Sequence, residues 1–454
     1  MLERTPITSD DIKMSMRSFL KNPSYRIAKN AVTSQGIEKV SKVPEAIARL
    51  TSTFDIEIEQ GEPTNQKQSG RCWMFAALNM MRSQTMRKYD LESFEFSQSY
   101  PLFYDKLEKA NWFLWNILDT LDEPTDSRLV TFLLKDPVGD GGQWDMFKSL
   151  IAKYGIVPKE AMPETACSEA TRDMNCYLTR YLRACAKHLR DAYVGGTKPI
   201  ALDAMRRDML EHVQHLLMIC LGKPPQEFDI RIKDRKGKIA LKGVFTPKTF
   251  LKAAVEVNPS DFVSVISVPM ADRPYDAVYT VDRLGNVVEA GGVRYLNLEL
   301  DELKRLVLLQ LENKLPVWFG CDIAQNYLDD DGILGIDTMD IDELFGFQIM
   351  GGFGKGERLE YGESRMTHAM TIVGVNLNPD GTPSLWKVEN SWGKDHGKGG
   401  FELMTDSWFD EYVYQIVINK RFLSHKQRVM IETARPIVLD PWDPIGALAI
   451  QHTL

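Results

Sequence analysis

Residues 65–75 have the sequence N-Q-K-Q-S-G-R-C-W-M-F, in which Cys72 follows a Ser-Gly-Arg turn and begins an apolar segment. The apolar residues after Cys72 recur at helical spacing, so we predict a buried helix that starts at this cysteine. A thiol at a helix N-terminus lies at the positive end of the helix dipole, which favours the thiolate and activates it as a nucleophile. Gln66 is close enough to fold back beside the sulfur, where its amide N–H and the Cys72 backbone N–H would bind an oxyanion.

Two segments in the second half of the chain supply the other groups that a cysteine nucleophile needs. Residues 366–375, M-T-H-A-M-T-I-V-G-V, place His368 at the start of an apolar strand, and residues 389–393 are E-N-S-W-G. His368 would take the thiol proton and return it to a leaving amine. Asn390 would orient the far imidazole nitrogen, with Trp392 screening that hydrogen bond from water. A lone buried cysteine is usually structural, but this ordered set favours a catalytic one.

These segments resemble the papain-like cysteine peptidases, and in particular their bleomycin hydrolase and aminopeptidase C branch. Gln-x-x-Ser-Gly-Arg-Cys-Trp, Thr-His-Ala-Met and Glu-Asn-Ser-Trp-Gly are typical of that branch. Cys72 and His368 lie 296 residues apart (368 − 72), against about 130–150 in papain itself. The resemblance implies an α+β fold, in which a helical lobe with the nucleophile faces a β-barrel-like lobe with His368 and Asn390 across a cleft. It also implies helical insertions, a hook hairpin and a C-terminal arm.

The resemblance extends over nearly the whole chain and implies which residues contact substrate. Residues 140–146, D-G-G-Q-W-D-M, look like the substrate-cleft loop of the branch. By resemblance, the substrate-binding residues are Gly141, Gly142, Trp144, Ala369, Trp392 and Ala449. A phosphate loop is the weaker interpretation of the glycines, because no Lys-Ser/Thr follows them.

The C-terminal residues carry the predicted restriction to amino ends. In the branch the arm lies in the cleft, and its terminal carboxylate meets the free amine of a peptide, so that only N-terminal residues are removed. Residues 440–449 match this arm, but the chain continues to Leu454, whereas family members usually stop at or just after the alanine. We expect the enzyme to trim its own tail back toward Ala449. The lengthened tail leaves an endopeptidase or tripeptidase variant as an alternative.

Sequence pattern and the resemblance together divide the chain into five predicted parts, of which the hook and the arm are implied by the resemblance. These are an N-terminal extension (1–62), a helical lobe with the nucleophile (63–225), a hook or hairpin insertion (226–260), a β lobe with the histidine and asparagine (261–436), and the arm (437–454). Within them we expect mostly helix from about Ser97 to Leu221 and a hairpin over Phe228 to Val244. The resemblance implies a ring-like homohexamer, with the hairpin used in assembly.

Charge and cysteine content bear on the possible binding partners and on the cellular compartment. The net charge is −8, which disfavours nonspecific nucleic-acid binding over the whole surface. A basic cluster on the hairpin leaves local nucleic-acid binding as an alternative: Arg231, Lys233, Arg235, Lys236, Lys238 and Lys242. No apolar run approaches a membrane span, and six scattered cysteines favour a reducing cytoplasm. His212 and His215 lack a third ligand, so we expect no metal, and the predicted chemistry needs no organic cofactor.

Overall fold

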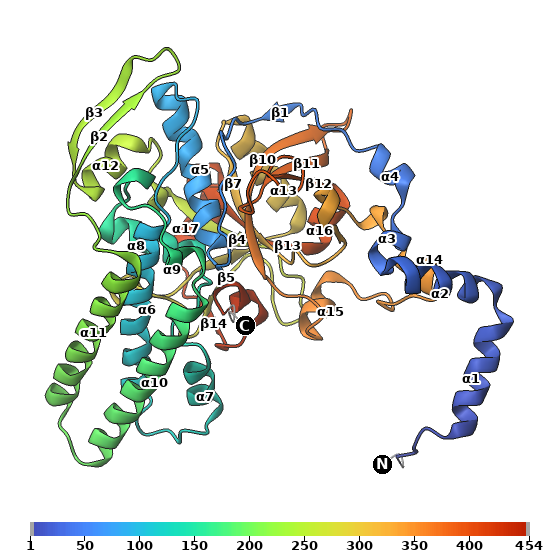
Figure 1. The fold of residues 1–454 in the computed structure, drawn as a ribbon, viewed down its shortest axis with the longest axis horizontal. Coiled ribbons are helices and arrows are strands. Elements are labelled where there is room, and N and C mark those ends of the chain that lie inside the picture. Colours follow the sequence, from blue (N-terminus) through green and yellow to red (C-terminus); the bar gives the residue numbers. More distant parts are fainter. Residues whose placement is uncertain (1–3, 451–454) are drawn as a thin grey trace.

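A computed structural model of the protein describes residues 4–450. Two layers dominate it: a block of long helices and a large twisted sheet, with the end of the described chain between them (Figure 1). The helical block comprises α5 (Cys72–Tyr89), α6 (Ser99–Asp119), α7 (Arg128–Lys135), α8 (Trp144–Tyr154), α9 (Ala166–Glu169), α10 (Arg172–Val194) and α11 (Pro199–Leu221). The predicted helix starting at Cys72 and the helical stretch that follows are both confirmed.

The sheet has twelve strands, and its centre carries the predicted histidine strand. Its order is β14 (Ile437–Leu439), β5 (Ala277–Val281), β6 (Tyr295–Asn297), β4 (Phe262–Ile266), β13 (Val413–Asn419), β7 (Val317–Cys321), β10 (His368–Leu377), β11 (Pro383–Glu389), β12 (Phe401–Thr405), β9 (Ile333–Leu334) and β8 (Tyr327–Leu328), with β1 (Ile56–Glu57) pairing to β10. Antiparallel pairing sets His368 opposite Cys321, and Thr371 of β10 opposite Glu389 of β11. The register therefore brings the residues after β11 close to the first residue of β10.

Strand residues alternate between two cores, one on each face of the sheet. On β7, Trp318 faces the core that contains α5, whereas Val317 and Phe319 face the core that contains α13 (Leu300–Glu312). The Trp318 indole donates to the Trp73 carbonyl at 3.0 Å, and Thr371 Oγ1 donates to the Ala76 carbonyl at 3.0 Å. Two strands are thus bonded directly to the nucleophile helix. The remaining helices of the second half are α14 (Ile341–Phe345), α15 (Lys355–Glu360), α16 (Asp406–Tyr412) and α17 (His425–Thr433).

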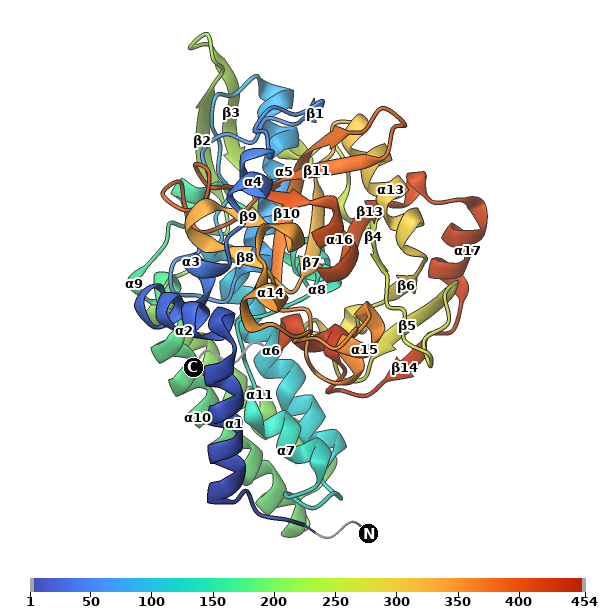
Figure 2. The same ribbon diagram turned by 90° about the vertical axis from the view of Figure 1, so that its right-hand side faces the viewer.

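Two appendages project from these layers. The predicted hairpin forms as β2 (Phe228–Lys233) and β3 (Ile239–Phe245), followed by α12 (Pro247–Ala254), and it stands at one end of the molecule (Figure 1). The N-terminal helices are α1 (Ser9–Lys21), α2 (Pro23–Gln35), α3 (Ile37–Ser41) and α4 (Pro44–Ala48). In Figure 2, α1 extends well away from the sheet. Within residues 4–450 no helix is both long and apolar enough to cross a bilayer.

Candidate active site

Cys72 is the first residue of α5, and buried contacts fix the turn that precedes it. The Arg71 side chain is buried and makes a bidentate ion pair with Glu164, at 3.1 and 2.9 Å, while its Nε donates to Ser69 Oγ at 2.9 Å. Charge-assisted fork contacts of this kind hold a guanidinium in one geometry. The turn is therefore rigid, and the Cys72 sulfur lies where the backbone N–H of Ala369 donates to it.

His368, Asn390 and Trp392 come together as predicted. His368 Nε2 lies 3.0 Å from Asn390 Oδ1, and the Ser391 backbone N–H donates to the same oxygen at 2.8 Å. The Trp392 ring lies over the imidazole with its centroid 4.9 Å away. Because an amide oxygen accepts, His368 Nε2 must carry the proton, which leaves Nδ1 as the acceptor for a thiol proton.

The protonation state of the nucleophile differs from the prediction. The helix N-terminus was expected to favour the thiolate, but burial raises the pKa of the Cys72 thiol to about 12 in spite of the hydrogen bond from Ala369. Burial likewise lowers the pKa of His368 to about 4, opposed by its hydrogen bond with Asn390. Desolvation disfavours every charged form, and here it outweighs the dipole. Burial in this structure therefore favours the neutral thiol and the neutral imidazole.

Gln66 lies beside the site and is tied to both lobes. Its Nε2 donates to the Ser69 carbonyl at 2.5 Å, and its Oε1 accepts from Ser391 Oγ at 2.6 Å. An amide nitrogen has two N–H groups, so one remains to donate elsewhere. The predicted oxyanion donor is thus held in one orientation.

The predicted cleft loop is anchored by Asp140 and contacts the C-terminal arm. Asp140 is buried and accepts from the Gly70 N–H at 2.9 Å and from Lys106 Nζ at 2.6 Å. Although burial opposes it, the Lys106 ammonium holds the pKa of Asp140 well below its usual range. A Cβ placed on Gly141 would lie 2.1 Å from the Leu448 carbonyl oxygen, and one on Gly142 would lie 2.4 Å from the Trp73 ring. Both glycines are required by close packing.

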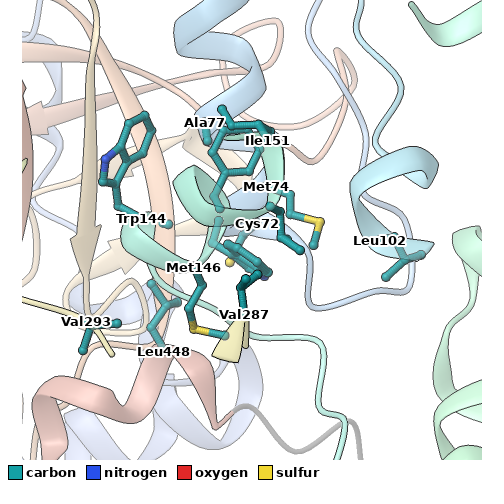
Figure 3. Packing of buried hydrophobic residues seen from close by; sticks show 14 of the residues in the cluster. Cys72, Met74, Ala77, Leu102, Trp144, Met146, Ile151, Val287, Val293 and Leu448 are labelled. Carbon is teal, nitrogen blue, oxygen red and sulfur yellow. The ribbon is translucent and has the colours of Figure 1, made fainter. Parts of the chain in front are cut away.

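The apolar side chains of the arm belong to the same core as the nucleophile. Ile445 and Leu448 are fully buried in the same core cluster as Cys72, and Figure 3 shows Leu448 near Cys72 and Met146. The arm is held by a hydrogen bond from Gln143 Nε2 to the Ile445 carbonyl at 3.3 Å and by an Asp443–Arg273 ion pair at 2.5 Å. Ala449 is the last residue of the 3-10 helix Pro444–Ala449, and it lines a cavity together with Lys109, Phe132 and Met146.

The remaining predicted substrate residues differ in their accessibility. Trp392 is half-buried, and Ala369 is buried next to the sulfur. Trp144 is fully buried and packs edge-on against Phe262, so its side chain belongs to the core and is not available to a substrate in this structure. From the sequence alone, Trp144 could line a cleft or lie in the core. Its packing in the structure shows that it lies in the core.

Sequence reasoning missed the charged groups behind the cleft loop. Lys109 is buried and donates to the carbonyls of Gly139 and Gly141 at 2.7 and 2.6 Å, with Asp105 as its counter-ion at 2.7 Å. Burial lowers the pKa of Lys109, and the Asp105 carboxylate opposes that shift. A signal existed, because Asp105, Lys106 and Lys109 interrupt an otherwise apolar face of α6. The histidines considered as metal ligands are engaged elsewhere: His212 Nδ1 lies 2.7 Å from the Tyr181 hydroxyl, and among residues 4–450 no cluster suited to a metal ion is found.

A cysteine at the start of a helix, beside a histidine that begins one strand and an asparagine that follows the neighbouring strand, defines a papain-like cysteine peptidase. Comparison with known proteins agrees: residues 6–446 match the model of the Peptidase C1-like family, and the chain belongs to that family. The chain is 42% identical over 445 residues to aminopeptidase C of Streptococcus thermophilus, covering 98% of this chain and 99% of the relative. It is 38% identical over 451 residues to bleomycin hydrolase of Mus musculus, covering 98% and 99%.

A solved structure gives the same result. The crystal structure of PepW from Lactobacillus rhamnosis superposes with a TM-score of 0.93 at 43% sequence identity, covering 97% of this chain and 99% of that chain. The predicted fold class and the predicted cysteine-type aminopeptidase class are therefore confirmed. The endopeptidase and nucleic-acid-binding alternatives gain no support from these relatives.

Proposed function

We propose that Cys72 is the nucleophile of an aminopeptidase, that His368 is its general base and acid, and that Asn390 orients the imidazole. The observation that carries this assignment is the 3.0 Å contact between His368 Nε2 and Asn390 Oδ1, next to a sulfur that accepts from Ala369. His368 Nδ1 takes the thiol proton as sulfur attacks the scissile carbonyl, and Gln66 with the Cys72 backbone N–H binds the oxyanion. The imidazolium then protonates the leaving amine, and water hydrolyses the thioester.

Ionisation of the pair requires the site to change as substrate binds. Burial favours the neutral thiol and the neutral imidazole, and Leu448 belongs to the same core as Cys72. A peptide entering the cleft brings polar backbone groups and displaces apolar contacts, which lowers the cost of charge separation. The catalytic ion pair would form in the substrate complex and would be absent from the resting enzyme.

We propose that the arm restricts cleavage to peptides with a free amino end. Its support is the contact of the Leu448 carbonyl with Gly141 and the position of Ala449 beside the cavity that Lys109 and Met146 also line. Residues 451–454, which the trimming hypothesis concerns, lie outside the described part of the chain. We expect the active enzyme to have lost residues beyond Ala449. Intact mass of fully active enzyme with Leu454 still present would contradict this.

We also propose self-association as a homohexamer and a cytoplasmic location. In support of assembly, α1 buries none of its residues and exposes Ile12, Met16 and Leu20 by 50%, 62% and 66%. Apolar groups grouped along one projecting helix mark a protein interaction surface. In support of a reducing compartment, all six cysteines are free thiols.

The decisive experiment compares an aminoacyl amide that has a free amine with the same compound acetylated at the amine. Wild-type enzyme of known C-terminal mass should turn over the free-amine compound at least tenfold faster, and Cys72→Ala should turn over neither. Equal or faster turnover of the acetylated compound would mean that the arm does not select amino ends. Activity in folded Cys72→Ala enzyme would refute the nucleophile assignment.

A further inference from the structure

A buried glutamate lies directly behind the His368–Asn390 pair. Glu402 is on β12, opposite Val388 of β11, and its carboxylate is fully buried. Its Oε1 accepts from Asn390 Nδ2 at 3.2 Å, on the side of the amide away from His368. The contact runs from the glutamate through the asparagine to the imidazole.

The surroundings of Glu402 hold its carboxylate in place. Tyr327 donates its hydroxyl to Oε1 at 3.2 Å, and His396 Nε2 lies 3.3 Å from the same oxygen and 3.3 Å from Asp329. The other oxygen, Oε2, is packed against Gly332 and Gly397, where an added Cβ would lie 2.7 and 2.8 Å away.

Oε2 receives no hydrogen bond from any residue that the structure describes. A buried carboxylate with one oxygen unpaired destabilises a fold. Such a group therefore calls for a reason other than stability.

We propose that Glu402 is a positioning residue that holds the Asn390 amide with its oxygen toward His368. An amide turned by 180° would present its NH2 to Nε2, and the imidazole would then carry its proton on Nδ1, where it cannot accept from the thiol. A carboxylate oxygen only accepts, so Glu402 selects the orientation with Nδ2 toward itself. The Ser391 N–H on Asn390 Oδ1, at 2.8 Å, selects the same orientation from the other side.

The proposed role needs an acceptor oxygen at this place and does not need a negative charge. Oε1 accepts whether or not the carboxyl is protonated, and the carbonyl oxygen of a glutamine accepts equally well. Glu402→Gln should therefore keep kcat within threefold of wild type. Glu402→Leu fills the site but removes the acceptor, and it should lower kcat about tenfold with KM changed less than twofold.

A double-mutant cycle tests whether the effect passes through Asn390. In an Asn390→Ala background, Glu402→Leu should change kcat less than twofold, because no amide remains to be oriented. Glu108→Leu is the matched control: Glu108 is also buried and accepts from the Tyr154 hydroxyl at 2.5 Å, but it lies on α6 in the helical block. It should lower Tm and leave kcat unchanged. If Glu402→Leu does not fold, Glu402→Asp withdraws the acceptor by one methylene and takes its place in the cycle with the same expected loss.

The inference rests on the roles proposed above for Asn390 and His368, and the outcomes separate the two. Wild-type kcat in folded Glu402→Leu, an equal loss in the Asn390→Ala background, or a loss above tenfold in Glu402→Gln would each overturn the positioning role. Activity of Cys72→Ala would instead overturn the proposed catalytic mechanism itself.

Discussion

Replacing Gly141 by alanine tests whether the arm sets the preference for amino ends. The new Cβ would lie 2.1 Å from the Leu448 carbonyl oxygen and 3.0 Å from the Ala449 carbonyl carbon. Contacts below 3.0 Å are essentially never found for a Cβ, so the arm must retreat by at least about 0.9 Å (3.0 − 2.1) at Leu448. The loop cannot yield instead, because Lys109 holds the Gly139 and Gly141 carbonyls and the Trp73 indole of α5 donates to the Asp140 carbonyl.

The arm should shift without leaving the cleft. Ile445 and Leu448 are fully buried, and burying two aliphatic side chains contributes about 3–6 kcal/mol, more than a strain of this size costs. A misplacement of about 1 Å at a positioning group can lower a rate roughly 10²-fold. We therefore expect kcat/KM for the free-amine aminoacyl amide to fall about 10- to 100-fold, and the acetylated compound to lose less than threefold.

Two further proteins make this prediction refutable. Gly195→Ala is the matched control, because its Cβ meets nothing nearer than 3.4 Å, and it should behave as wild type. In a chain ending at Pro444 the clash is absent, so Gly141→Ala should change kcat/KM less than twofold. Unchanged preference in full-length Gly141→Ala would refute the anchoring role of the arm. An equal loss in the shortened chain would show that Gly141 acts on the substrate directly.

Because Cys72 and His368 are buried, we expect iodoacetamide to alkylate the Cys72 thiol slowly at pH 7. Burial raises the pKa of the thiol to about 12 and lowers the pKa of the imidazole to about 4, so both neutral forms are favoured. Removing residues 445–454 should speed the alkylation at least tenfold. Equal rates would contradict the desolvation argument. Asp140→Ala leaves Lys106 buried without its counter-ion and should cost about 3–5 kcal/mol in urea unfolding, an effect that Lys106→Met in the same chain should partly reverse. Because the pKa of Asp140 is depressed in the folded state, its contribution to the free energy of unfolding is fully present above the ordinary carboxyl pKa and is lost as acid protonates the carboxylate. A urea unfolding midpoint that does not change between pH 6 and pH 3 would count against this. Changing Ile12, Met16 and Leu20 to serine should lower the particle mass in light scattering while leaving the circular dichroism intact, and an unchanged mass would exclude α1 from assembly.

Short sequence patterns correctly predicted those features of the fold that depend on residues close together in the chain. The start of α5 at Cys72, the strand at His368 and the hairpin were all visible as short-range periodicity and turn chemistry, and the motifs placed His368 beside Asn390. The helix α13 was not foreseen among the strands of the second half. The residue boundaries of the five predicted parts remain predictions.

What the sequence could not show depends on distant pairings and on burial. Asp140 meets Lys106 across two elements, and Glu402 meets Asn390 only because β11 and β12 pair in one register. The helix-dipole argument for Cys72 was sound locally but omitted the desolvation that packing imposes, which reverses its sign. Both kinds of term appear only when the tertiary structure is known.

The arm has one part that is fixed to the sheet and a second part that contacts the cleft loop. β14 is paired in parallel with β5, and Asp443 is fixed by Arg273, so the chain is secured as far as Pro444. The short segment from Pro444 to Ala449 follows, and its Leu448 carbonyl contacts the loop at Gly141. Exchanging this last segment would remove the burial of Ile445 and Leu448 but would leave the pairing of β14 and the Asp443–Arg273 ion pair in place. New end-specificities are therefore accessible by exchanging a few terminal codons, both to natural variation and to library design.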